Sequence, residues 1–276
     1  MNLVLIAVIT LGSIAFILSI VLYIASKKFA VYEDERIAKI TEILPQANCG
    51  GCGYPGCSGF ADACVKASSL DDKCCPVGGQ EVMAKVASIL GMNAGTIERK
   101  VAVVRCNGTY ASRLRNNIYD GVKVCAVVAS LYSGETDCSY GCLGCGDCVT
   151  VCRFDAVYIN PETGLPHVCE EKCTACGACV KACPKSIIEL RFVGKNFRHI
   201  YVSCVNQDKG AITRKACSAG CTGCGKCVKT CQYEAITLEN NVAYIDYNKC
   251  EMCGKCVDTC SQHSIVDSLI FNSKLC

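Results

Sequence analysis

Residues 142–152 read CLGCGDCVTVC, and residues 173–184 read CTACGACVKACP. Both stretches have the spacing C-x2-C-x2-C-x3-C, which is typical of thiolate ligands to [4Fe–4S] clusters. In this arrangement three close cysteines bind three irons of one cubane, and the fourth cysteine binds the neighbouring cubane. The two stretches therefore predict a pair of clusters whose ligand sets interlock.

The spacing also predicts which cysteines share a cluster. One set is Cys142, Cys145, Cys148 and Cys183, and its neighbour is Cys173, Cys176, Cys179 and Cys152. The same spacing returns twice further on, which predicts two more sets: Cys221, Cys224, Cys227 and Cys260, then Cys250, Cys253, Cys256 and Cys231. Four runs of one spacing predict two tandem modules of the bacterial ferredoxin type.

The composition favours clusters over the other structural uses of cysteine. The chain has 29 cysteines in 276 residues, above the roughly 8–10% at which cysteine content becomes diagnostic. Disulfide scaffolds are mostly short secreted domains, and structural zinc sites use paired knuckles, often with histidine. Here one spacing recurs four times and only three histidines are present. We therefore interpret the runs as cluster ligands in a reducing compartment.

Other chemistries find no support in the residues. The net charge is +3 and tryptophan is absent, so no basic and aromatic surface for nucleic acid is indicated. The chain has no G-x-G-x-x-G after a strand and no phosphate-binding P-loop. We expect it to transfer single electrons and not to reduce NAD itself.

A long apolar segment lies at the N-terminus. Residues 3–26 read LVLIAVITLGSIAFILSIVLYIAS, without a charge, which is enough helix to cross a hydrocarbon layer of about 30 Å. A signal peptide would place cations before the apolar run, whereas Lys27 and Lys28 follow it. Positive charge after the span predicts that the rest of the chain is cytoplasmic. We expect a single uncleaved anchor.

A different cysteine pattern follows the anchor. Residues 49–57 read CGGCGYPGC, and the pair Cys74–Cys75 precedes Pro-Val-Gly-Gly. The glycines allow a tight bend that directs N–H groups at the sulfurs. Cys64 lies in an alanine-rich helical stretch and is expected to be a small buried residue. Before this motif, residues 29–48 predict a short amphipathic helix.

These motifs together resemble a known family. CGGCGYPGC behind a membrane helix and ahead of tandem ferredoxin motifs resembles the B subunit of the Rnf complex, an ion-translocating ferredoxin:NAD⁺ oxidoreductase of bacterial membranes. The resemblance implies a fourth ligand shortly before a Gly-Gly pair, which best matches Cys75, with Cys74 as the alternative. The first cluster would then be held by Cys49, Cys52, Cys57 and Cys75, and the chain would bind five [4Fe–4S] clusters.

The resemblance also implies a function and partners. Soluble reduced ferredoxin would donate electrons, and the clusters would relay them to other Rnf subunits, including flavin-bearing and multi-span membrane subunits. The chain would be a translocase subunit with no catalytic site of its own, single-pass in the inner (cytoplasmic) membrane. Ion movement would belong to the partners, because one helix without ionisable residues offers no ion path.

Two rival functions remain at this point. One is a membrane-bound polyferredoxin that serves another redox complex, such as a hydrogenase or a reductase. The other is a non-redox zinc or scaffold protein. The first motif favours the Rnf type over the polyferredoxin. A brown colour, with broad absorption near about 400 nm that bleaches on reduction, would exclude the zinc or scaffold protein.

The chain contains an internal repeat over residues 101–183 and 200–260. Each copy starts with an apolar run ending in a cysteine (Cys106 or Cys204) and enters its first run by a C-x3-C step (from Cys138 or Cys217). Two short strands around a turn are expected between the runs of each copy, and a short helix after each run. This pattern predicts a βαββαβ-like ferredoxin shape.

We therefore predict an α+β protein of four parts. They are a transmembrane anchor (residues 1–28), a small four-cysteine cluster domain (29–98), a first ferredoxin module with an N-terminal insert (99–190), and a second such module (191–276).

Two further questions stay open. Five clusters leave several cysteines over: Cys64, one of Cys74 and Cys75, Cys106, Cys125, Cys138, Cys169, Cys204, Cys217 and Cys276. They are either buried thiols or include a sixth cluster on Cys106, Cys125 and Cys138.

Basic residues between the modules predict either a landing site for acidic ferredoxin or a solvated mixed surface. These residues are Lys195, Arg198, His199, Lys209, Arg214 and Lys215.

Overall fold

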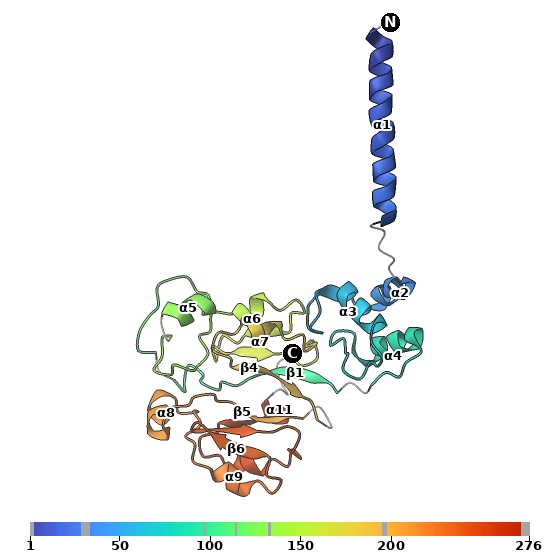
Figure 1. The fold of residues 1–276 in the computed structure, drawn as a ribbon. Helices are drawn as coiled ribbons and strands as arrows, with labels where there is room; N and C mark the ends of the chain where they lie inside the picture. The colour runs from blue at the N-terminus through green and yellow to red at the C-terminus, as the bar shows by residue number, and fades with distance from the viewer. Residues whose placement is uncertain are drawn as a thin grey trace.

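The computed structural model describes residues 3–28, 34–95, 98–113, 115–131, 134–194 and 198–271. A long isolated helix comes first, then a small helical domain, then two modules of similar topology (Figure 1). The predicted α+β class is confirmed, with an apolar N-terminal helix ahead of mixed helices and short strands.

The N-terminal helix α1 (Leu3–Lys28) stands away from the rest of the chain (Figure 1). Its segment Val8–Lys28 is long and apolar enough to cross a membrane, and none of it is buried against the protein. The hydroxyls of Ser13 and Ser19 donate to carbonyls three residues earlier in the helix. Because the helix satisfies its own polar groups, it suits a hydrocarbon environment.

The helical domain consists of α2 (Glu35–Ile43), α3 (Gly56–Val65) and α4 (Gly79–Leu90). Helix α2 is the described part of the amphipathic helix predicted at 29–48, of which residues 29–33 lie outside the described residues. Its apolar side packs Ile40 against Phe60 and Met83 in one core. Cys64 is fully buried in this core, as predicted.

The first module pairs its outer strands and its inner strands separately. Its elements are β1 (Lys100–Val104), α5 (Cys125–Leu131), α6 (Asp147–Thr150), β2 (Val157–Ile159), β3 (Pro166–Val168), α7 (Ala178–Ala182) and β4 (Ile188–Phe192). Strand β1 pairs antiparallel with β4, and β2 with β3. Apart from the inserted α5, this is the predicted βαββαβ order.

The second module repeats the pattern. Its elements are β5 (Ile200–Val202), α8 (Gly210–Ala216), α9 (Lys226–Thr230), β6 (Ile236–Glu239), β7 (Val242–Ile245), α10 (Lys255–Thr259), β8 (Ile265–Asp267) and α11 (Ser268–Phe271). Strand β5 pairs with β8, and β6 with β7. Asn240 and Asn241 have φ of 48° and 63°, so they make the tight hairpin turn that their sequence predicts.

The prediction of a short helix after each cysteine run is wrong in position. Helices α6, α7, α9 and α10 lie inside the runs, and each contains the third cysteine. Each begins after a left-handed glycine, such as Gly146 or Gly225. The third and fourth cysteines are four positions apart, so a single helical turn places both on one face. The next strand then follows the fourth cysteine after a turn.

The two modules pack against each other through their outer sheets. Val101, Val103, Tyr201 and Val266 form one buried apolar cluster across the contact. The side chain of Arg191, which is 1% exposed, crosses from β4: its Nη1 donates to the carbonyl of Ile245 at 3.0 Å.

Two neighbours balance the charge of Arg191. Its guanidinium pairs with the Glu189 carboxylate and lies 5.0 Å from the ring centroid of Tyr244. A buried cation with these partners holds the modules in one orientation.

Replacing this cation should loosen the contact between modules. In Arg191→Leu the Ile245 carbonyl loses its donor and the Glu189 carboxylate keeps only its pair with Arg105, so we expect about 2–3 kcal/mol less stability. The measurement is the midpoint of anaerobic urea unfolding. Arg115→Leu is the matched control: Arg115 makes a surface pair with Glu135, so its removal should cost less than about 1 kcal/mol. Equal losses in the two variants would contradict this role.

Candidate metal centres

One cavity in the second module is lined by four cysteines from both of its runs. Cys221, Cys224 and Cys227 come from the first run, and Cys260 is the last cysteine of the second. Leu238, Ala243 and Ile265 close the apolar side of the same cavity. Four thiols that converge on a mostly apolar pocket fit a cubane, and they are the interlocked set that the spacing predicts.

The matching cavity of the first module is lined by Cys142, Cys148 and Cys183, together with Cys125. The remaining predicted ligand, Cys145, lies beside Cys125. Burial and then the neighbouring Cys125 thiol raise the pKa of Cys145 to about 11. The predicted set therefore gathers in one place, with Cys125 as an additional neighbour that the spacing does not indicate.

In each of the other two predicted sets, the thiols lie close enough to affect one another's pKa. Burial, followed by the thiols of Cys173 and Cys176, raises the pKa of Cys179 to about 12, and Cys152 contributes too. Burial raises the pKa of Cys256 to about 12, and the neighbouring thiols add to the effect, Cys250 most and then Cys227 and Cys253. Cys231 acts on the pKa of Cys250 in the same direction. These buried thiols hold their protons near neutral pH, so cluster assembly must release them.

Backbone N–H groups point at several of the sulfurs. The amide of Ala102 donates to Cys173 Sγ and that of Ala156 to Cys152 Sγ, each at 3.4 Å. Donors of this kind stabilise thiolates and tune the potential of a bound cluster. The strand β1 thus supports a predicted ligand that lies 71 residues away in the chain.

In the helical domain Cys75 and Cys74 differ in their exposure to solvent. Cys75 is 7% exposed and its Sγ accepts from the amide of Gly78 at 3.3 Å. Burial raises the pKa of Cys75, and the thiols of Cys52 and Cys57 add to the effect. Cys74 is exposed to solvent. Cys52 and Cys57 pack against the core cluster that contains Cys75, and the Asn48 side chain accepts from the amide of Cys57 at 2.8 Å.

The arrangement of these described side chains does not form a site for a single metal ion. Among the described residues, no three cysteine, histidine, aspartate or glutamate side chains converge closely enough to hold one metal ion. The irons of a cubane occupy separate corners, so its ligands stand further apart than those of a tetrahedral zinc.

The predicted basic landing site is wrong for two of its residues, and Lys195 lies outside the described residues. Arg198 is ion-paired with Asp267. His199 is 4% exposed, and burial lowers its pKa to about 4. The charge of Arg198 is thus already paired within the chain, and His199 lies below the surface. Lys209, Arg214 and Lys215 are exposed.

The cysteines outside the predicted ligand sets fit neither a uniform set of buried thiols nor a sixth cluster on Cys106, Cys125 and Cys138. Cys169 is disulfide-bonded, so its interpretation as a buried thiol is wrong. Cys125 lines the cavity of Cys142, whereas Cys106 and Cys138 line a separate cavity between the modules. The structure therefore does not group Cys125 with Cys106 and Cys138.

Comparison with known proteins matches these regions. A family described as "Putative Fe-S cluster" matches residues 44–76, and one described as "4Fe-4S dicluster domain" matches residues 141–187 and 220–264. The chain is thus similar to cluster-binding domains over all the cysteine motifs named above.

Three relatives are similar over nearly the whole chain. Identity is 47% over 250 residues with the B subunit of the Na(+)-translocating ferredoxin:NAD(+) oxidoreductase complex of Acetobacterium woodii, covering 91% of this chain and 74% of the relative. It is 39% with the B subunit of the proton-translocating ferredoxin:NAD(+) oxidoreductase complex of Clostridium ljungdahlii, covering 91% and 87%. It is 37% with the B subunit of the ion-translocating oxidoreductase complex of Methanosarcina acetivorans, covering 87% and 89%.

The contrast between Cys75 and Cys74 is testable by counting iron. Cys75→Ser should lower the iron content of anaerobically purified protein by about four atoms per chain, the content of one cubane. Cys74→Ser is the adjacent control and should leave the content unchanged, because its side chain faces solvent. Loss of iron from Cys74→Ser with retention in Cys75→Ser would reverse the assignment.

Proposed function

Because the chain belongs to the family of B subunits of ion-translocating ferredoxin:NAD⁺ oxidoreductase (Rnf) complexes, we propose that its thiolates hold five [4Fe–4S] clusters in a row between a soluble ferredoxin and the membrane. The chain is an iron–sulfur electron-transfer subunit of a membrane-bound complex. Each cluster, when bound, accepts and releases one electron at a time. The five ligand sets are the ones named from the spacing and from Cys49, Cys52, Cys57 and Cys75.

The observation that carries this proposal is the interlocked cavity of the second module. Cys260 ends one run and yet lines the cavity of Cys221, Cys224 and Cys227. Sharing cysteines between two runs keeps two clusters adjacent within one module. The proximity of Cys179 to Cys152 supports the same arrangement in the first module.

Direct packing connects the helical domain to the first module. A Cβ atom at Gly51 would lie 2.9 Å from Cys176 Cα, so the loop from Cys49 to Cys52 lies against a predicted ligand of the next cluster. Nearby, Arg153 Nη1 donates to the carbonyl of Ala47 at 3.0 Å. Only a glycine allows this approach, which supports electron transfer between the two parts.

The second module is the better place for ferredoxin to dock. Cys224 and Cys253 are exposed there, so two predicted ligands reach the surface. A Cβ at Gly210 of α8 would collide with the Thr222 carbonyl, so α8 sits directly on the loop that carries Cys224. Lys209, Arg214 and Lys215 on and beside α8 are exposed. This cationic surface would steer an acidic ferredoxin toward Cys224.

The helix α1 and its charges support the membrane topology of the proposal. Lys27 and Lys28 end the helix, which favours a single-pass anchor in the inner membrane with the cluster domains in the cytoplasm. Flavin-bearing and multi-span subunits would then complete NAD⁺ reduction and ion translocation. Nothing in the part of the chain that the structure describes favours the alternative of a polyferredoxin that serves a hydrogenase or another reductase.

Reversing charge beside α8 tests the docking site. In Lys209→Glu/Lys215→Glu we expect reduction of the chain by reduced ferredoxin to slow about tenfold or more at low salt, and its dependence on ionic strength to flatten. Stopped-flow absorption under anaerobic conditions measures the rate. Lys66→Glu/Lys85→Glu makes the same charge change on exposed helix surfaces of the helical domain and should leave the rate nearly unchanged. Equal rates in both double variants would exclude α8 as the docking site.

A further inference from the structure

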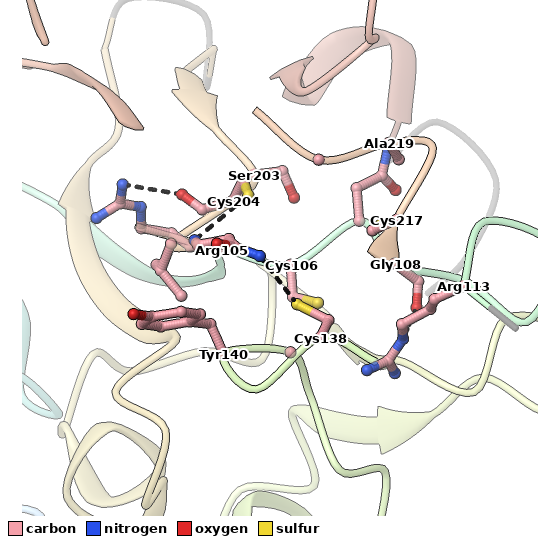
Figure 2. Close-up of a pocket in the computed structure, with 15 residues that line it drawn as sticks. Arg105, Cys106, Gly108, Arg113, Cys138, Tyr140, Ser203, Cys204, Cys217 and Ala219 are labelled. Carbon is pink, nitrogen blue, oxygen red and sulfur yellow. Dashed lines mark hydrogen bonds between the residues drawn. The ribbon is translucent and has the colours of Figure 1, made fainter. Parts of the chain in front are cut away.

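A second group of four cysteines lies between the two modules. Cys106, Cys138, Cys204 and Cys217 line one cavity, around which Figure 2 shows their side chains arranged. Three of them are buried and Cys106 is half-buried. None belongs to the four ferredoxin runs or to the CGGCGYPGC motif.

Each copy of the internal repeat contributes one matched pair. Cys106 follows strand β1 and Cys204 follows the equivalent strand β5. Cys138 and Cys217 each stand four residues before the first cysteine of a run, in CSYGC and CSAGC. The two copies therefore supply equal halves of one four-thiol site, although each half alone is incomplete.

N–H groups converge on these sulfurs as they do on the predicted ligands. The backbone amide of Asn206 donates to Cys204 Sγ and its side-chain Nδ2 to Cys138 Sγ, both at 3.5 Å. The amide of Cys142 donates to Cys106 Sγ at 3.5 Å. Asn206 is 1% exposed, so its two donors are committed to sulfur at a buried position. Such donors favour the thiolate form.

Two arginines give the cavity positive charge. Arg105 and Arg113 both line it (Figure 2), and Arg113 is itself buried, with its Nε donating to the Gly108 carbonyl at 2.5 Å. Arg105 Nη2 donates to the carbonyl of Cys204 at 3.2 Å. Four thiolates with iron and sulfide carry net negative charge, which these guanidinium groups would offset.

We propose that Cys106, Cys138, Cys204 and Cys217 bind a further [4Fe–4S] cluster between the two modules. All four thiols are free of disulfide bonds. As in the ferredoxin runs, these side chains form no single-ion site among the residues that the structure describes. A cubane would use the four cysteines, the buried N–H donors and the two cations together. Isolated thiols would need neither the donors nor the cations.

The site adjoins one predicted ligand on each side. Cys142, whose amide contacts Cys106 Sγ, starts the ligand set of the first module. The amide of Cys221, which starts a set of the second module, hydrogen-bonds to the Cys204 thiol. A cluster here would take one electron from a reduced cluster of one module and pass it to an oxidised cluster of the other, without proton transfer. This bridging role rests on the proposed function, whereas the binding site does not.

The test is an iron, sulfide and zinc count on the full chain purified anaerobically. We expect about 24 irons and about 24 sulfides per chain, the content of six cubanes. Cys138→Ser/Cys217→Ser should lose about four of each. The control Cys74→Ser removes a solvent-exposed cysteine outside the cavity and should keep the wild-type content. About 20 irons in the wild type, an unchanged iron content in the double variant, or one zinc that disappears in the double variant would each overturn the proposal.

A second measurement on the wild-type chain does not depend on a variant folding. Coulometric titration with a low-potential reductant should take up about six electrons per chain, one for each cubane, and an uptake of about five would overturn the sixth site. Iron and electrons are counted here without ferredoxin. The outcome therefore remains separate from the question of which protein donates the electrons.

Discussion

The sulfur atoms of the cysteine runs occupy the centres of two very small cores. In the first module Cys142, Cys148 and Cys179 are buried with Val104 and Ile187. In the second, Cys227 and Cys256 are buried with Ile245. The surrounding sheets have two strands each, and an isolated two-stranded sheet is at best marginally stable in water. Bonds between thiolate and iron must therefore provide much of the stability of each module.

Other features of the fold follow from this constraint. Left-handed glycines before α6, α7, α9 and α10 let the chain bend tightly within each run. A single helical turn then carries the third cysteine, and the chain leaves toward the next strand. In the proposed ligand sets each run contributes its last cysteine to the neighbouring cluster, which would make the two sets one folding unit. Arg191 and Arg105 then fix the two units against each other.

Much of this organisation is predictable because it is local. Ligand sets follow from the spacing of nearby cysteines, and the hairpin at Asn240–Asn241 follows from residues that accept positive φ. The burial of His199 and the pairing of Arg198 depend on partners such as Asp267, 69 residues further on, which no local pattern indicates. The hypothesis of a site on Cys106, Cys125 and Cys138 groups three cysteines of one copy of the repeat. In the structure Cys106 and Cys138 instead share a cavity with Cys204 and Cys217, which belong to the other copy.

A signal for that grouping is nevertheless present. Cys106 and Cys204 hold equivalent positions in the two copies, as do Cys138 and Cys217. Equivalent residues of two packed repeats tend to face a common interface, so the repeat itself could have identified the four-thiol site. The repeat does not predict the role of Asn206. Its side chain reaches Cys138 only after the two modules have packed.

The central claim is that iron–sulfur clusters hold these modules together, and hydrogen exchange tests it most directly. Backbone amides in the β1–β4 and β5–β8 pairs would be measured before and after anaerobic removal of iron with a chelator. The account predicts that both strand pairs lose protection when the iron is removed, while α1 in detergent remains protected. If both strand pairs kept their protection without iron, the apolar residues alone would suffice to fold the modules, and the account would be contradicted.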